Sequence, residues 1–362
     1  MNRLFWFSAF VIGYTYLGYP LLLAAWARAA RRPNRKANVG EYRNWPSISI
    51  VLAVRNEAAR LPARLDNLLQ LKYPGRRELI VVSNGSSDGT RDVLAAYADR
   101  VQAVEIPAGG KARALNAGVS IAAGDILIFA DARQQFSANA LVELAANFID
   151  SEVGGATGEL VLDSECGEPT SSVGESVGLY WKYEKWLRRN ESAVWSTLGA
   201  TGAIYAIRRE LWRPLPPDAL LDDVLVPMRV VLEGRRIVFD EKARAYDHAS
   251  TDAASETRRK TRTLAGNYQI LAQEPRLLVP VLNPVWLQYM SHKVSRLFVP
   301  WALIAAFVAS AVLAPSHWFF TAALSMQIAF YSLAAIGAAL EARERRGFLN
   351  QVSAIPEGKG AR

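Results

Sequence analysis

The chain has 362 residues, an apolar fraction of 51% and a mean hydropathy of only +0.05, which together indicate a soluble domain combined with a few strongly apolar segments. Its 42 basic and 34 acidic residues give a net charge of +8, and much of the excess lies beside the apolar segments, a pattern typical of a membrane surface that argues against a nucleic-acid binder. The single cysteine, Cys166, excludes an intrachain disulfide, fits a reducing compartment and is interpreted as an ordinary thiol.

The first element in chain order is an uncharged apolar run over residues 4–27, which is long enough to cross a bilayer as a helix. A signal peptide is the alternative, because Ala27-Arg28-Ala29 resembles a cleavage site. The run is longer than the apolar core of a signal, however, and its basic cluster follows it. Five basic residues lie between positions 28 and 36, against Arg3 alone before the run. The positive-inside rule therefore predicts an outer amino terminus, an anchor over 1–27 and a cytoplasmic domain after it.

Residues 28–45 are basic and polar, and we interpret them as a linker. After them, apolar runs typical of strands alternate with runs of helical spacing, joined by short loops. This alternation predicts a doubly wound α/β domain with a mostly parallel sheet over residues 46–272. The expected strands in its first half are 47–53, 78–82, 101–106 and 125–130, and the expected helices are 57–71, 88–98 and 111–122.

The pattern is less regular after residue 130. An aromatic helix and a basic helix stand out among elements of ordinary composition, and we expect the aromatic side chains to pack in the core, to contact the membrane or to stack on a ligand. The expected elements are helix 137–149, strand 153–162, aromatic helix 178–189, strand 203–207, helix 220–233, strand 236–240 and basic helix 255–272.

The chain ends in further apolar segments. Residues 273–295 mix aromatic and polar side chains, as interfacial helices do, and 297–313 with 318–340 form a candidate transmembrane hairpin over 296–340. The tail 341–362 carries Arg343, Arg345 and Arg346, which favour the cytoplasm. The three spans together predict a multi-pass protein of the cell's inner (plasma) membrane with its carboxyl terminus inside.

A strand that is apolar on both faces ends at a carboxylate. Five apolar residues separate Asp125 from Asp131, and open α/β sheets bind their ligands at the carboxyl ends of such strands. A carboxylate is costly to bury there unless it is paired or binds a metal. Asp131 is therefore our candidate ligand for Mg²⁺ or Mn²⁺, which prefer oxygen ligands and bridge phosphate groups.

Three further polar motifs follow strands or open helices in the same half. They are Arg55-Asn56-Glu57, the small-residue stretch 83–90, and residues 110–118 with Lys111 at a helix start, where it could neutralise phosphate. Each has a simpler interpretation: Glu57 beside a helix start, Asp88 as a helix cap, and Lys111 as part of a solvated basic turn.

Taken in order, these motifs resemble those of the family-2 glycosyltransferases. The resemblance covers roughly residues 46–270 and extends to Gly199–Ala203, Arg208 and the acidic pair Asp222-Asp223. It implies a single nucleotide-sugar-binding domain of the A type, an inverting transfer and a nucleoside-diphosphate sugar donor, with a UDP sugar expected. The membrane-attached form is similar to the processive polysaccharide synthases.

The resemblance also implies roles for individual residues. Asp223 takes the position of the catalytic base, which accepts the proton of the acceptor hydroxyl as it attacks the anomeric carbon. Asp131 takes the metal position. Donor-binding positions fall on Arg55, Glu57, Asn84, Asp88, Lys111, Asn116, Asp131, Arg133, Arg259 and Arg262, and acceptor-side positions on Gly202 and Asp222. Beside the resemblance, the aromatic side chains of Tyr180 and Trp181 are candidates to stack on sugar rings at the acceptor side.

The chain departs from the family pattern at three places. Asn84 stands where many relatives carry Asp, and the Asp-X-Asp motif is Asp131-Ala132-Arg133, so that either one carboxylate suffices with the diphosphate or Arg133 supplies charge directly. In the Gln-X-X-Arg-Trp element only Arg262 matches, which puts processive synthesis in question. For Asp223 the alternative role is a helix cap, and for Arg259 and Arg262 it is a solvated helix face.

The sequence thus predicts a membrane-anchored transferase that acts on a polysaccharide or a lipid-linked glycan. Three spans are few for an export pore, so secretion would need a homo-oligomer or an export partner. Transfer of a single sugar to a polyprenyl phosphate or lipid is the alternative activity. The altered motif at Asp131 also keeps open a non-catalytic membrane scaffold with the transferase fold, although Lys111 and Asp223 argue against such decay.

Overall fold

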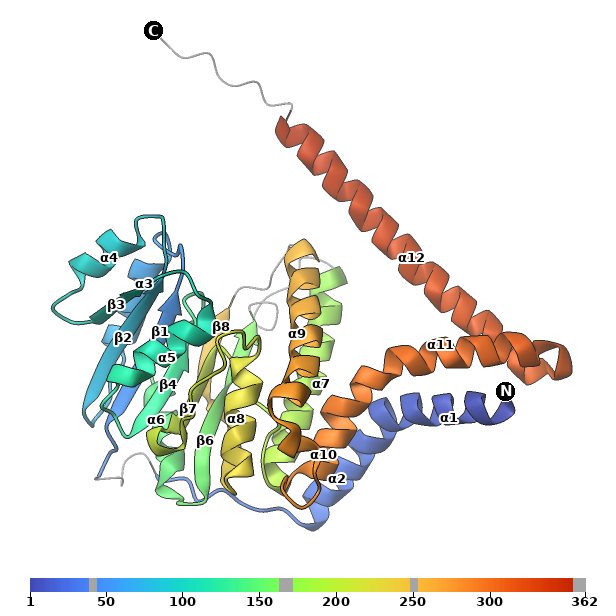
Figure 1. Cartoon of the computed structure of the whole chain (residues 1–362), viewed down its shortest axis with the longest axis horizontal. Coiled ribbons are helices and arrows are strands. Elements are labelled where there is room, and N and C mark those ends of the chain that lie inside the picture. The colour runs from blue at the N-terminus through green and yellow to red at the C-terminus, as the bar shows by residue number, and fades with distance from the viewer. Residues whose placement is uncertain (39–43, 163–171, 248–252, 354–362) are drawn as a thin grey trace, which may run out of the picture. The chain divides into compact units, whose positions relative to one another are not determined.

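The computed structural model describes residues 1–38, 44–162, 172–247 and 253–353 (Figure 1). Close contacts divide the chain into two units. An α/β unit runs from Leu17 to Val294, and a helical unit comprises the chain before Leu17 and after Val294. The acidic loop with Cys166 lies outside the described residues, and side chains are not described for the tail from residue 341 onward.

One eight-stranded sheet organises the α/β unit, in the order β3-β2-β1-β4-β7-β6-β8-β5 (Figure 1). Its first four strands pair in parallel, β7 pairs antiparallel with both β4 and β6, and β6 pairs in parallel with β8. The prediction of a doubly wound, mostly parallel sheet is therefore confirmed. The strands are β1 Ile48–Val54, β2 Arg77–Asn84, β3 Gln102–Ile106, β4 Ile126–Ala130, β5 Gln135–Phe136, β6 Val153–Leu162, β7 Ile204–Arg208 and β8 Arg236–Asp247.

Helices cover the sheet and create two apolar layers. One layer packs α3 and α6 on the sheet, and the other packs α5 and α8, with Phe129 of β4 stacked between the rings of Tyr205 and Trp212. All five residues of β4 are buried, as the apolar run predicts. The helices of this unit are α2 Tyr19–Ala29, α3 Leu61–Gln70, α4 Thr90–Ala96, α5 Lys111–Ile121, α6 Ala140–Ala145, α7 Ser172–Val194, α8 Asp222–Leu232, α9 Ala253–Gln273 and α10 Trp286–Tyr289.

Several boundaries differ from the sequence predictions for local reasons. Helix α3 begins at Leu61 instead of residue 57, because Pro62 favours a helix start. Strand β8 continues seven residues beyond the expected end at Asp240, and its charged residues alternate with buried ones across a bulge in its pairing with β6. An apolar run could not reveal this half-exposed continuation.

The basic segment after the first apolar helix is attached to the α/β unit. Arg32 contacts Glu152, and Lys36 forms ion pairs with Glu143 and Asp240, the latter at 2.6 Å. The buried guanidinium of Arg236 donates to the carbonyl oxygen of Arg32. Part of the positive charge that the sequence attributes to a membrane surface is therefore neutralised by carboxylates of the domain itself.

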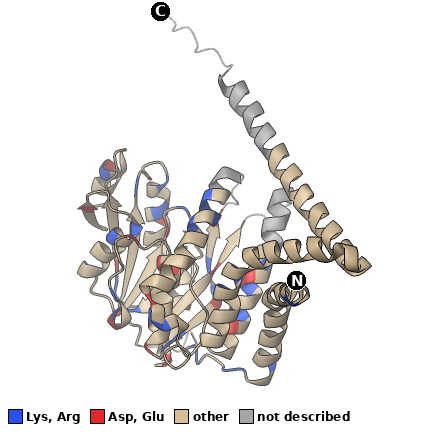
Figure 2. Ribbon diagram, turned by 45° about the vertical axis from the view of Figure 1, so that its right-hand side comes forward, with Lys and Arg blue, Asp and Glu red and all other residues tan. Residues whose placement is uncertain are grey.

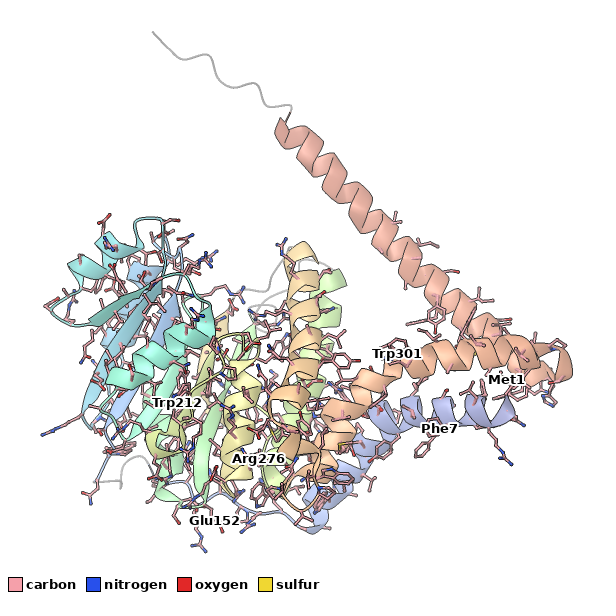
Figure 3. All side chains as sticks on the ribbon, viewed as in Figure 1. Met1, Phe7, Glu152, Trp212, Arg276 and Trp301 are labelled. Carbon is pink, nitrogen blue, oxygen red and sulfur yellow. The ribbon has the colours of Figure 1, made fainter. Side chains whose placement is uncertain are left out.

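The helical unit consists of long apolar helices. Helix α1, Asn2–Gly13, packs along α11, Ser295–Leu313, and α12, Trp318–Ser353, follows a short turn. Figure 2 shows α11 almost without charged residues, and large side chains such as Phe7 and Trp301, labelled in Figure 3, are about two-thirds exposed. Within the described part of the chain, three segments are long and apolar enough to span a membrane: Asn2–Ala29, Trp286–Ser316 and Trp318–Leu340.

The α/β unit presents apolar side chains of its own close to these segments in sequence. In the turn before α10, the buried side chain of Asn283 bonds the carbonyl oxygen of Leu277 and the amide of Val285, so the turn is internally braced. Val281 at its tip is 93% exposed. Such an exposed, preformed apolar turn is typical of a surface that contacts lipid.

Candidate active site

The loops after β1 and β2 are joined by side-chain hydrogen bonds. Asn56, at φ 55°, accepts from the backbone amide of Ser87, and Asp88 accepts from the amides of Ala58 and Thr90. These bonds, chiefly from Thr90 and Ala58, lower the pKa of Asp88. Asp88 therefore braces the loops and the start of α4, close to the capping role that the sequence left open.

The end of β2 is held close to the loop before α5. Asn84 is buried, and its side-chain oxygen accepts from the backbone amide of Gly109 at 2.8 Å. Gly85 has φ 61°, and a Cβ atom there would lie 2.5 Å from the backbone of Ala108. The Asn84 side chain is thereby oriented by the loop before α5.

A lysine and two carboxylates meet at the carboxyl edge of the sheet. The Nζ atom of Lys111, at the start of α5, lies 3.0 Å from Asp131 and 3.2 Å from Asp222. Burial disfavours the charge on Lys111, but Asp131, Asp222 and Asp223 outweigh it and raise the lysine's pKa. Asp222, expected on the acceptor side, thus shares its cation with the metal candidate Asp131.

Asp223 occupies the first turn of α8, beside the glycine-rich loop 199–202. Its carbonyl oxygen accepts from the amide of Ala200 at 2.7 Å, and a Cβ atom at Gly202 would lie 3.1 Å from its carboxylate oxygen. Burial and the neighbouring charge of Asp222 raise the pKa of Asp223 to about 6, although Lys111 opposes the shift. A carboxylate in this state is ionised at neutral pH and is a stronger base than an ordinary aspartate.

Two predicted donor residues are engaged elsewhere. Asn116 forms hydrogen bonds in both directions with the backbone of Leu215, each at 2.8 Å, and so ties α5 to the segment before α8. Arg133 pairs with the buried Asp247 at 2.6 Å. The guanidinium of Arg133 therefore serves the end of β8, and Lys111 is the cation that contacts Asp131.

The remaining candidates lie on more exposed surfaces. The Arg259 guanidinium of α9 lies 5.9 Å from the ring of Trp181 on α7, and Tyr180 is 55% exposed. Arg262 and Arg55 are exposed, and Glu57 lies 3.7 Å from Arg60. None of these contacts joins the group around Lys111.

The residues at Asp131 fit a divalent cation only in company with a ligand. Among the described residues, no three His, Cys, Asp or Glu side chains gather as a metal site. Magnesium, however, is commonly bound through one or two carboxylates together with substrate phosphates. Asp131 is 38% exposed, so it offers one carboxylate to a cation that a diphosphate would help to hold.

Two cations near Asp223 were not among the sequence candidates. Arg188 of α7 donates to the hydroxyl of Thr201 at 2.6 Å, and Lys293 lowers the pKa of Asp223 by its charge. Both are far from Asp223 in sequence, and neither belongs to a recognisable motif. Only the spacing of Arg188 on a helix already suspected of lining the acceptor side could have drawn attention to it.

Comparison with known proteins identifies the domain. The family model described as glycosyl transferase family 2 matches residues 49–213. The β-monoglucosyldiacylglycerol synthase of Trichormus variabilis is 31% identical over 157 residues, covering 41% of this chain and 32% of that protein. The poly-β-1,6-N-acetyl-D-glucosamine synthase of Staphylococcus aureus is 22% identical over 238 residues, which cover 63% of this chain and 56% of that protein. The chain therefore spans about half, or less, of the length of these curated relatives.

A solved structure agrees in fold over nearly the whole chain. The mannosyltransferase PcManGT of Pyrobaculum calidifontis, in complex with GDP-Man and Mn²⁺, has a TM-score of 0.70 at 20% identity and covers 98% of this chain and 100% of that one. With the family match, this similarity confirms the resemblance seen in the ordered motifs. The chain contains a glycosyltransferase family 2 domain with an A-type fold.

Proposed function

We propose that the protein is a membrane-anchored glycosyltransferase that transfers a sugar, with inversion, from a nucleoside-diphosphate sugar to a polysaccharide or lipid-linked glycan. The observation that carries the proposal is the convergence of Lys111, Asp131 and Asp222 at one edge of the sheet, with Asp223 next in the chain. This arrangement combines a phosphate-neutralising cation with a separate, partly buried carboxylate of raised pKa.

The two carboxylates at 131 and 223 have different tasks. Lys111 neutralises the donor diphosphate, and Asp131 holds the Mg²⁺ or Mn²⁺ that, when bound, stabilises the leaving diphosphate. Asp223 takes the proton from the acceptor hydroxyl. With a single base and no nucleophile of the enzyme, one displacement occurs at the anomeric carbon and inverts it.

The donor is expected to be a UDP sugar. The family relation supports a nucleotide sugar, and PcManGT was solved with GDP-Man, so both nucleotides belong in the test. The three apolar segments and the exposed turn at Val281 support attachment to the inner (plasma) membrane, with the catalytic domain in the cytoplasm and the amino terminus outside. Export of a long product would require a homo-oligomer or another protein.

A nucleotide-release assay tests the proposal. The full chain in lipid nanodiscs is incubated with a panel of UDP and GDP sugars, with Mg²⁺ or Mn²⁺ and a membrane extract as acceptor source. We expect release with at least one donor and its loss in Asp223→Asn. If the wild type releases nucleotide from none of the donors, the enzymatic proposal fails and the result supports the non-catalytic scaffold.

The metal proposal has its own measurement. Calorimetry with Mn²⁺ should show weak or no binding to the protein alone and clear binding once the nucleoside diphosphate is present, because Asp131 supplies only one carboxylate. Asp131→Asn should abolish the second signal. Tight Mn²⁺ binding without nucleotide would contradict this account.

A second activity is transfer of a single sugar to a lipid. It is supported by a relative whose name specifies a diacylglycerol product and by the incomplete Gln-X-X-Arg-Trp element, in which Arg259 and Thr263 replace two positions. The product of the same reaction decides between the two. A ladder on a sizing gel indicates a polymer, whereas one lipid-soluble product indicates single transfer.

A further inference from the structure

Helix α7 carries a partly buried arginine that contacts the loop beside the proposed base. Arg188 donates to the hydroxyl of Thr201 at 2.6 Å, and its guanidinium lies 5.9 Å from the ring of Phe239. Thr201 in turn donates its backbone amide to the side chain of Thr157 at 2.8 Å. The loop 199–202 is therefore held from two sides, by α7 and by β6.

This loop is the immediate neighbour of Asp223. The amide of Ala200 donates to the carbonyl oxygen of Asp223, and Gly202 faces the carboxylate closely enough that a Cβ atom would lie 3.1 Å from it. A displacement of the loop would therefore displace the base. Arg188 reaches the base through Thr201, and its charge is attracted first by Glu184 and Glu191 of the same helix and then by Asp223.

Helix α7 is itself fixed one turn further along. Glu191, which is buried, accepts from the hydroxyl of Tyr19 at 3.0 Å and lies 2.5 Å from the Nδ1 atom of His292. On the same helix, Glu184 lies 3.6 Å from the other ring nitrogen of His292. The segment that presents Arg188 is thus clamped by α2 and by the turn after α10, so the arginine is held in a preset position.

We propose that Arg188 is a positioning residue for the base: through Thr201 it holds the loop 199–202, and its permanent positive charge favours the ionised carboxylate of Asp223. This inference rests on the proposed function, because it assigns Asp223 as the base. It adds a contribution from α7 that is separate from the Lys111 cluster.

Several charged groups of the described residues act on Asp223, and they must be distinguished. Asp222 on α8 and Asp131, directly after β4, disfavour its ionisation, whereas Lys111 on α5 and Lys293 after α10 favour it. Arg188 on α7 adds to the second set. Removing Arg188 is therefore expected to move the acidic limb of the activity profile to higher pH.

Three variants separate charge from geometry. Arg188→Met should lower kcat roughly tenfold or more, leave the KM for the donor within about twofold, and shift the acidic limb of kcat upward. Arg188→Lys should restore the position of the limb but only part of kcat. Thr201→Val, the matched control, removes the hydroxyl but no charge, so it should lower kcat without moving the limb.

Two kinetic results overturn the inference: a wild-type kcat and pH profile in Arg188→Met, or a shift of the acidic limb in Thr201→Val equal to that in Arg188→Met. Circular dichroism and nucleotide binding verify that each variant is folded.

A double-mutant cycle of melting temperatures with Asp223→Asn tests the charge contact without turnover. At pH 8, Arg188→Met should lower the melting temperature more in the protein that retains Asp223 than in the Asp223→Asn background. This difference should disappear near pH 4, where Asp223 is protonated. Equal decreases in melting temperature at pH 8 would contradict the contact. An inactive wild type with a positive cycle would refute the proposed function alone.

Discussion

The proposed donor edge, around Lys111 and Asp131, and the region of the proposed base, Asp223, are built in different ways. At the donor edge, each polar motif directly follows a strand or opens a helix, so Asp131 and Lys111 meet because parallel strands end together. Around Asp223, the contacts come from loop 199–202, β6 and α7, which are distant in sequence. The residues at the ends of the parallel strands are thus placed by the sheet itself, whereas Asp223 depends on side chains that connect several elements.

The largest difference between the two regions should appear in turnover. Asp223→Asn is expected to lower kcat by about 10²–10⁴-fold, because it removes the base, while nucleotide binding at the donor edge persists. The control variant is Asp125→Asn, at the opposite end of β4, where the carboxylate accepts hydrogen bonds from the amide and hydroxyl of Ser47. Retained turnover in Asp223→Asn, measured by nucleotide release, would shift the base role to another residue.

A smaller effect is expected when the donor edge is changed. Lys111→Met removes the cation from the diphosphate, and charged hydrogen bonds contribute about 1.5–3 kcal/mol each, which corresponds to a roughly 10- to 150-fold weaker nucleotide affinity. Calorimetry with the nucleoside diphosphate measures it. A variant that binds normally but turns over slowly would instead place Lys111 with the base.

The acidity of the base sets a pH dependence. Because the pKa of Asp223 is raised to about 6, the ionised base is lost as pH falls through 6, and kcat should decrease up to tenfold per pH unit below pH 5.

The stability of the fold should change with pH in the opposite direction to turnover. Ionising a group with a raised pKa costs folding free energy, so Asp223→Asn should raise the melting temperature above pH 6 and have no effect below the ordinary value of 3.8. Melting curves at pH 3.5 and 8 test this, and equal melting temperatures at pH 8 would contradict it.

The smallest effect concerns a donor-side prediction that the structure uses for packing. Asn116→Ala removes two hydrogen bonds to Leu215 and should cost about 1–2 kcal/mol of unfolding free energy. Nucleotide affinity of the folded protein should stay within twofold, because the Asn116 amide is already engaged. A large loss of nucleotide affinity in a folded Asn116→Ala variant would instead support the predicted role of Asn116 in donor binding.

The amino-acid sequence by itself determined where the strands of the first half lie along the chain, the apolar segments and the ordered motifs, because buried parallel strands are continuous apolar runs and their ends are chemically distinct. It could not decide which cation serves which carboxylate. Arg133 lies next to Asp131 in the chain but pairs with Asp247, whereas Lys111 crosses from α5 to both Asp131 and Asp222. Likewise, the basic stretch with Lys36 was interpreted as a linker, yet its charge is neutralised by Glu143 and Asp240. Such pairings depend on distances between elements far apart in sequence, which only the tertiary structure fixes.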